Sequence, residues 1–396
     1  RPRGYHPDDG TVIRETDISL LDANFLREDL FDELAATPDD AAIVDDAWGG
    51  HFDAGDWDRR VHHMWYASMA ADVSLLFPAA VESFDLLIPE TGDGIPDVLA
   101  DALWTADFYR RLQLPNGAIR GGIEATGHPV NDSTSWIEPQ PAYAFAPDAR
   151  SSYVYAATAA HLAEAVEPYD RARADELTES AVRAAEWAEA NPPDFDDNER
   201  TERQRPVAAA SLFARTGDER WHDIVRETAD FADRANPRLG CHARINCDAV
   251  WYYLGADPEQ ADPEIREYAL ATLVAAADLA LENAASTVIG WGVEDDGQRP
   301  EWGHGLGGTP KVLTLLRAHA MTGDERYLAQ AQQTVAISTG ANPLNTSFIT
   351  GMGPNPPRYP LVVDSVAGAV PVWPGTPVFG GHAPRRDQAW MAEQLD

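Results

Sequence analysis

The chain has 396 residues, and its 44% apolar fraction is ample for a core; the length fits one large domain better than two. It carries 65 Asp plus Glu against 30 Lys plus Arg, a formal net charge of -35, with Lys311 as the only lysine. Such a charge repels nucleic-acid phosphates and anionic membranes. No apolar run approaches the roughly 18 residues of a membrane span, so neither class of partner is expected.

The loss of lysine together with the carboxylate surplus is typical of a surface that works in molar salt, where counter-ions screen self-repulsion. We therefore expect a halophile's protein; an ordinary acidic enzyme is the alternative. Cys241 and Cys247 enclose a loop short enough for a disulfide in an oxidising compartment. Buried thiols are the alternative, and with His242 they provide too few ligands for an obvious metal site. The chain begins at Arg1 without a signal-like segment, which predicts a processed or trimmed chain.

The pattern of residues 1–50 predicts an irregular N-terminal segment with a short helical stretch around Leu20 to Leu34. From Trp57 apolar residues recur at helical spacing until Pro78 ends the helix. A turn cluster precedes a second helix at 97–113. The segment 115–147 is rich in Gly and Pro, and a loop of that length is usually functional.

Further helical patterns follow one another, whereas the apolar–polar alternation of strands is nearly absent. This predicts an all-α chain built from helical hairpins. The patterns cover residues 151–166, 171–191, 204–216, 219–236, 249–254, 263–285, 310–322 and 325–339.

An internal repeat supports the hairpins. Thr-Gly-Asp-Glu-Arg followed by an aromatic residue occurs at 216–221 and again at 322–327. In each copy Gly can end one helix, Asp can cap the next, and the aromatic residue enters the core. A ring of about six such hairpins is an (α/α)6 barrel, which repeats of this kind favour over a four-helix bundle. From about residue 340 an irregular tail begins, with a short helical piece at 386–395, and all 396 residues are predicted to form one catalytic domain.

The stretch 49–58 contains three carboxylates, three glycines and three aromatic rings. Glycines allow backbone dihedrals that can aim neighbouring carboxylates at one point, and a helix cap at Asp56 is the structural alternative. Carboxylates with aromatic rings in a cleft suggest glycoside hydrolysis. Asp53 and Asp56 could then hold a water and take its proton, while the acid must come from elsewhere.

This stretch resembles the Asp-Ala-Gly-Asp motif of glycoside hydrolase family 9, the inverting cellulases and related exo-enzymes on an (α/α)6 barrel. Four further stretches occur in the order of that family: 88–97, 116–122, 340–343 and 347–355. The resemblance implies that Asp56 is the general base and that Asp53 helps to hold the nucleophilic water.

The family's general acid is a glutamate near the C-terminus after an aromatic residue, which implies Glu393 here, with Trp390 before it. Glu124 and Glu138 from the long loop are rival acids. Where the cellulases carry Pro-His-x-Arg for sugar binding, this chain reads Pro-Leu-Val-Val at 360–363. Either nearby residues compensate or the pocket serves something other than a long cellulose chain.

Candidate sugar contacts are polar or aromatic residues in or beside the loops: His51, Trp57, Arg120, Trp136, Trp251, Trp302, Arg358 and His382. Core packing is the alternative for the tryptophans. The family often holds a structural calcium, which implies Asp218, Glu219 and Asp248 as ligands; no cofactor is expected to be required. The glycine-rich stretch 303–308 follows no strand and lacks a P-loop lysine, which argues against a nucleotide site.

The sequence thus predicts a monomeric, secreted inverting glycosidase acting on β-1,4-glucan in high salt. One alternative is an exo-acting glucosidase or glucosaminidase on short oligosaccharides, which the missing His-x-Arg favours. The other is a sugar-binding relative without turnover.

Overall fold

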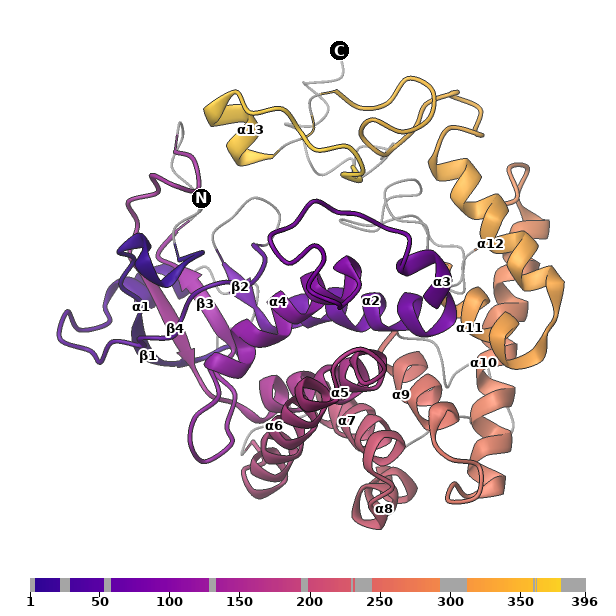
Figure 1. Ribbon diagram of the computed structural model, residues 1–396, viewed down its shortest axis with the longest axis horizontal. Coiled ribbons are helices and arrows are strands. Elements are labelled where there is room, and N and C mark those ends of the chain that lie inside the picture. Colours follow the sequence, from indigo (N-terminus) through magenta and orange to yellow (C-terminus); the bar gives the residue numbers. More distant parts are fainter. Residues whose placement is uncertain are drawn as a thin grey trace.

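The computed structural model describes residues 4–21, 29–52, 58–127, 133–193, 199–228, 231, 244–292, 312–358, 360 and 362–378. Helices dominate these residues (Figure 1). The α-helices are α1 (Leu30–Ala35), α2 (Met64–Leu76), α3 (Pro78–Val81), α4 (Asp97–Arg111), α5 (Ala149–Val166), α6 (Arg171–Ala190), α7 (Glu199–Thr216), α8 (Glu219–Thr228), α9 (Arg244–Gly255), α10 (Pro263–Ser286), α11 (Leu313–Thr322), α12 (Glu325–Ser338) and α13 (Val363–Gly368). Short 3-10 helices are η1 (Pro7–Asp9) and η2 (Val61–His63).

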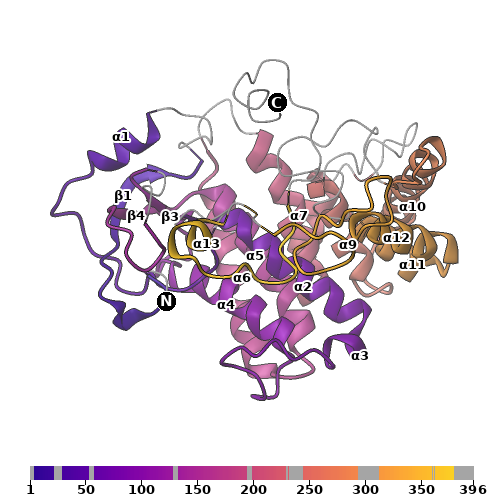
Figure 2. The same ribbon diagram turned by 90° about the horizontal axis from the view of Figure 1, so that it is seen from above.

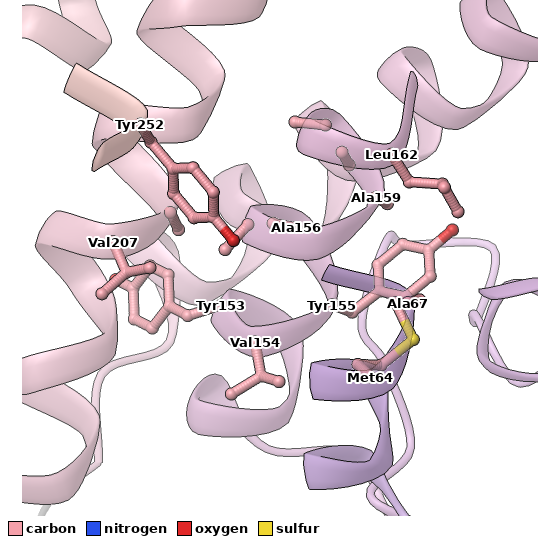
Figure 3. Packing of buried hydrophobic residues seen from close by; sticks show 14 of the residues in the cluster. Met64, Ala67, Tyr153, Val154, Tyr155, Ala156, Ala159, Leu162, Val207 and Tyr252 are labelled. Atoms are coloured by element: carbon pink, nitrogen blue, oxygen red, sulfur yellow. The ribbon is translucent and has the colours of Figure 1, made fainter. Parts of the chain in front are cut away.

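Helix α5 is the centre of the packing, since it is buried on nearly all sides and contacts α2, α4, α6 and α7. Small alanine side chains let these helices approach closely, and larger residues fill the spaces between them (Figure 3). Tyr155 of α5 lies beside Met64 and Ala67 of α2, and Tyr252 of α9 packs from another side of α5. The chain then continues as packed pairs, α7 with α8, α9 with α10 and α11 with α12.

The two repeated corners fold as predicted. Gly217 and Gly323 take left-handed backbone angles of φ 65° and 69°. The carboxylates of Asp218 and Asp324 accept from the backbone N–H two residues later, at 3.1 and 2.9 Å. The aromatic residues that follow are buried in the core, Trp221 at the start of α8 and Tyr327 at the start of α12. Both corners therefore join a pair of helices in the same manner.

A small four-stranded sheet, which the sequence analysis did not predict, lies beside α1. Its order is β1-β4-β3-β2, with β1 parallel to β4 and the other pairs antiparallel. Its strands are short, and the two central ones, β3 and β4, are buried on both faces, so they lack the apolar–polar alternation that marks half-buried strands. The strands are β1 (Arg14–Ser19), β2 (Arg59–Arg60), β3 (Gly122–Ala125) and β4 (Ala142–Ala146).

After α12 the irregular tail runs back across the molecule to the side of the sheet, where α13 lies (Figures 1 and 2). The predicted helix at 386–395 and the two cysteine side chains lie outside the described residues. Among the described helices, α10 is long and apolar enough to span a membrane. It packs against α9, α11 and α12 as part of the helical array.

Candidate active site

The segment that leads into the Asp-Ala-Gly-Asp motif is fixed on one face of α4. Gly49 and Gly50 have φ angles of 89° and 75°. A Cβ at Gly50 would lie 2.9 Å from the ring of Phe108, so only glycine fits there. Trp104 Nε1 donates a hydrogen bond to the Gly50 carbonyl at 3.2 Å. The Arg111 guanidinium donates to the carbonyl of Trp48 at 2.7 Å. The path of the backbone into the motif is therefore determined by α4.

His51 is the last side chain of this segment with polar anchors. Its Nδ1 lies 2.6 Å from the Thr105 hydroxyl oxygen, and its Nε2 lies 3.3 Å from a carboxylate oxygen of Asp101. The Tyr66 hydroxyl on α2 donates to the other oxygen of Asp101. Burial would raise the pKa of Asp101, but the hydrogen bonds from His51 and Tyr66 outweigh it and lower that pKa. Burial, with the Asp101 charge added, raises the pKa of Tyr66.

The catalytic candidates of the motif, Asp53 and Asp56, lie outside the described residues, as does Trp57. The chain is described again from Asp58, which is buried and pairs with Arg60 at 3.1 Å between Oδ2 and Nε. Because the residues on both sides of 53–57 are held by described contacts, the two ends of the motif loop are fixed on the barrel and on the sheet.

The sheet holds the segment that follows the motif. Arg59 pairs with Ile123 across β2 and β3, and Gly122 has φ 118°. A Cβ at Gly122 would lie only 1.8 Å from the Arg59 carbonyl oxygen, so the close approach of the strands requires glycine. The buried Arg59 guanidinium stacks over the Phe52 ring at 4.4 Å. Burial lowers the pKa of Arg59 to about 10.

The two rival acids, Glu124 and Glu138, both make hydrogen bonds within the fold. The buried carboxylate of Glu124 accepts from Arg60 Nε at 2.6 Å, and an arginine partner stabilises the ionised form rather than a proton donor. Glu138 is buried as well, and it accepts from the backbone N–H of Gln140 at 2.9 Å. Both side chains therefore make contacts within the fold.

The predicted sugar contacts that lie among the described residues have different surroundings. Arg120 is buried and donates to Glu15 at 2.6 Å, and Trp251 donates from its indole N–H to Asp72 at 2.7 Å. Both thus serve contacts within the fold. Trp136 is 43% exposed beside α13, and Arg358 is exposed in the tail. Trp302, His382 and Glu393 lie outside the described residues.

The tail is fastened near the sheet and folds on itself. Asp364 of α13 accepts from both the backbone N–H and the hydroxyl of Ser135, each at 2.6 Å. The two family-like tail motifs meet, because a Cβ at Gly340 would lie 2.5 Å from Pro354. Within the second motif, the Ser347 N–H donates to the Pro354 carbonyl at 2.8 Å. The Ser135–Asp364 contact therefore connects the long loop to the tail.

The predicted calcium ligands do not form a metal site. Asp218 pairs with Arg220 at 2.8 Å, Glu219 pairs with Arg226 at 2.6 Å, and Asp248 lies on another helix. Throughout the described ranges, no three His, Cys, Asp or Glu side chains are arranged to hold a metal ion. Asp218 and Glu219 form ion pairs with arginine side chains, so the predicted ligands do not fit a calcium ion.

A buried ionic cluster, which the sequence analysis did not predict, lies between α2, α5, α9 and α11. Asp72 accepts from Arg317 at 2.6 Å and lies 2.8 Å from His161 Nε2. Arg317 also donates to Asp248 at 2.8 Å. Burial alone would lower the pKa of His161, but Asp72 and Glu164 outweigh it and raise the pKa to about 9. Burial would raise the pKa of Asp72, but Arg317 and His161 outweigh it and lower that pKa.

Charged residues on the apolar faces of α2 and α11 were the sequence signal for this cluster. A cavity of about 270 Å³ adjoins it, lined in part by His161, Glu164, Trp251 and Tyr252. The polar groups of Asp72, His161 and Trp251 are already satisfied by one another, so the cluster stabilises the barrel rather than presenting a ligand site.

The described chain consists of packed helical hairpins, and the residues on both sides of the stretch 53–57 are held on α4 and on the sheet. The chain belongs to glycosyl hydrolase family 9, whose model matches residues 22–363. The predicted (α/α)6 barrel is thereby confirmed, with the small sheet as an addition.

Known relatives agree with this family. Endoglucanase D from Acetivibrio thermocellus is 24% identical over 86% of this chain and 56% of its own length. A cellulose 1,4-beta-cellobiosidase of the same organism is 23% identical over 83% of this chain and 42% of its own. The chain thus spans about half the length of these curated relatives. A thermostable endoglucanase structure from Alicyclobacillus acidocaldarius superposes with a TM-score of 0.75 at 23% identity, covering 88% of this chain and 68% of that one.

Proposed function

We propose that this chain is an inverting glycoside hydrolase that cleaves β-1,4-linked glucan outside the cell. The observation that carries the proposal is the family match over 22–363, which includes the whole Asp-Ala-Gly-Asp loop. The anchored segments on both sides of that loop support it, because a catalytic carboxylate must be held close to its productive position.

In the proposed reaction Asp53 steadies a water and Asp56 takes its proton. The water oxygen then bonds to the anomeric carbon from the face opposite the leaving group. Glu393 gives its proton to the glycosidic oxygen as the bond between that oxygen and the anomeric carbon breaks. Inversion requires room for the water, so about 6.5–9.5 Å should separate the base and acid carboxyls.

The test is a substrate panel in molar NaCl with wild type beside Asp56→Asn. We expect wild type to release α-anomeric sugar from β-glucan, observed by NMR before mutarotation, and Asp56→Asn to lose about 1,000-fold or more of kcat. A β-anomeric first product, or full activity in Asp56→Asn, would overturn the mechanism. A wild-type chain inactive on every β-linked substrate would overturn the proposed function.

An exo-acting enzyme on short oligosaccharides is the second candidate. It is favoured by the tail, which reads Pro-Leu-Val-Val at 360–363 in place of the Pro-His-x-Arg that the sequence analysis associates with sugar binding in cellulases. Product profiles on cellohexaose and on chitooligosaccharides separate the candidates. An endo-enzyme yields mixed internal products, whereas an exo-enzyme releases one short product from the start.

A further inference from the structure

His51 has a role in the structure that the proposed reaction does not use. It stands two residues before Asp53 in the chain. Its ring lies 5.3 Å from the Tyr66 ring in an edge arrangement, in addition to its contacts with Asp101 and Thr105. Three side chains from two helices therefore determine where this imidazole sits.

One face of α4 supplies most of these contacts. Asp101, Trp104, Thr105 and Phe108 are spaced at i, i+3, i+4 and i+7, which places them on one side of a helix. Trp104 and Phe108 contact the Gly50 backbone position, and Asp101 and Thr105 contact the His51 ring. The same helix thus fixes both the backbone and the side chain just before the motif.

The anchors of His51 are themselves packed or hydrogen-bonded. Thr105 is buried at 1% exposure, and Asp101 accepts from Tyr66 on α2 as well as facing His51. The His51 side chain remains 41% exposed, so part of the ring faces solvent. The contacts therefore hold the segment at one side of the ring.

We propose that His51 is a positioning residue for the catalytic loop: its contacts with Asp101 and Thr105 fix the point from which Asp53 and Asp56 are presented. This inference rests on the proposed function. Displacing catalytic groups by about 1 Å costs on the order of 100-fold in rate. His51 would therefore contribute to kcat without contacting the reacting atoms.

The activity test compares His51→Ala with His51→Gln, whose amide can still reach Thr105 and Asp101. We expect His51→Ala to lower kcat about 10- to 100-fold with KM changed less than about twofold, and His51→Gln to recover most of the loss. Free imidazole should restore nothing, because the loop is held through the covalent chain. The matched control is His319→Ala on α11, which removes one contact with the Asp324 carbonyl and should keep the wild-type rate.

A double-mutant comparison tests the route of the effect. If Asp101 acts through His51, Asp101→Asn with His51→Ala loses no more kcat than His51→Ala alone. Additive losses would assign Asp101 a separate role and overturn the inference. Wild-type kcat in His51→Ala would overturn it directly, and rescue by imidazole would show that His51 takes part in the chemistry instead.

A second readout does not depend on turnover. Hydrogen exchange of the peptide that covers 53–57 should be faster in His51→Ala than in wild type, and unchanged in His319→Ala. If wild type proves inactive on every sugar, the proposed function fails while this measurement still decides the positioning role. Unchanged exchange in His51→Ala would contradict it.

Discussion

Replacing Asp72 by Asn tests whether the buried cluster closes the helical array. Asp72 on α2 and Arg317 on α11 are 245 residues apart in the chain, and the pair joins the first long helix of the array to a late one. In Asp72→Asn, His161 and Arg317 remain buried beside a neutral amide. Arg317 keeps Asp248, whereas His161 loses its main partner.

Two physical arguments give the same magnitude. Removing one member of a buried ion pair costs about 3–5 kcal/mol of unfolding free energy. Asp72 together with Glu164 raises the pKa of His161 from 6.5 to about 9, and at roughly 1.4 kcal/mol per pH unit the whole shift sets an upper limit of about 3.5 kcal/mol for the part that Asp72 contributes through His161. We expect the lower end of the range, about 3 kcal/mol, because Asp248 continues to compensate Arg317.

The pH dependence follows from the sign of the shift. A group whose pKa is raised by folding stabilises the folded state. This stabilisation is complete when the pH is below the pKa of the group in the unfolded chain, and it is lost as the pH rises through the pKa in the folded chain. The contribution of His161 is therefore present below pH 6.5 and disappears by about pH 9. The difference between wild type and Asp72→Asn should be largest near pH 6 and should shrink towards pH 9.5.

Urea unfolding at constant molar NaCl measures this difference. Circular dichroism and tryptophan fluorescence must give coincident transitions for the free energies to be valid. Asp223→Asn, at an exposed carboxylate of α8 paired with Arg226, is the control and should cost less than about 0.5 kcal/mol. A loss below about 1 kcal/mol at pH 6, or an equal loss at both pH values, would refute the reasoning.

Two further predictions concern glycine and salt. Gly122→Ala should abolish stable folding, or cost at least about 3 kcal/mol, because its Cβ would lie 1.8 Å from the Arg59 carbonyl oxygen. Gly323→Ala meets open space and should cost only about 1 kcal/mol. Equal melting temperatures of the two variants would contradict this prediction. Because the chain has a net charge of -35, its exposed carboxylates should repel one another when salt is removed. The helical ellipticity should therefore fall on dialysis below about 0.1 M NaCl and return when molar salt is restored. An unchanged spectrum would identify an ordinary acidic protein.

The helices and their corners could be predicted because their signals are local. Apolar spacing marked α5 and α12, and the repeated Gly-Asp pairs marked two corners that the structure reproduces. The sheet could not be predicted, since β2 has two residues and β3 has four, too few for a periodic pattern. The pairing of Arg59 with Ile123 depends on contacts between distant segments.

The motif loop could be recognised from its composition, but its anchors could not. Asp101 and Thr105 occupy one face of a predicted helix, and nothing in their spacing indicates that His51, about 50 residues earlier, lies on that face. Arg120 and Trp251 were predicted as sugar contacts because of their residue types and neighbouring loops. The structure uses them for Glu15 and Asp72, since buried polar groups need partners wherever the fold places them.

The arginines show how such an acidic chain can still build a specific core. Arg317 is almost completely buried and Arg60 is largely buried, and each contacts two carboxylates. A guanidinium suits this role better than an ammonium because its planar donors can serve two acceptors at once. Buried pairs are screened little by salt, whereas repulsion among exposed carboxylates is screened strongly. We therefore expect salt to act on this fold mainly through repulsion at the outer surface, while the buried arginine–carboxylate contacts keep their strength.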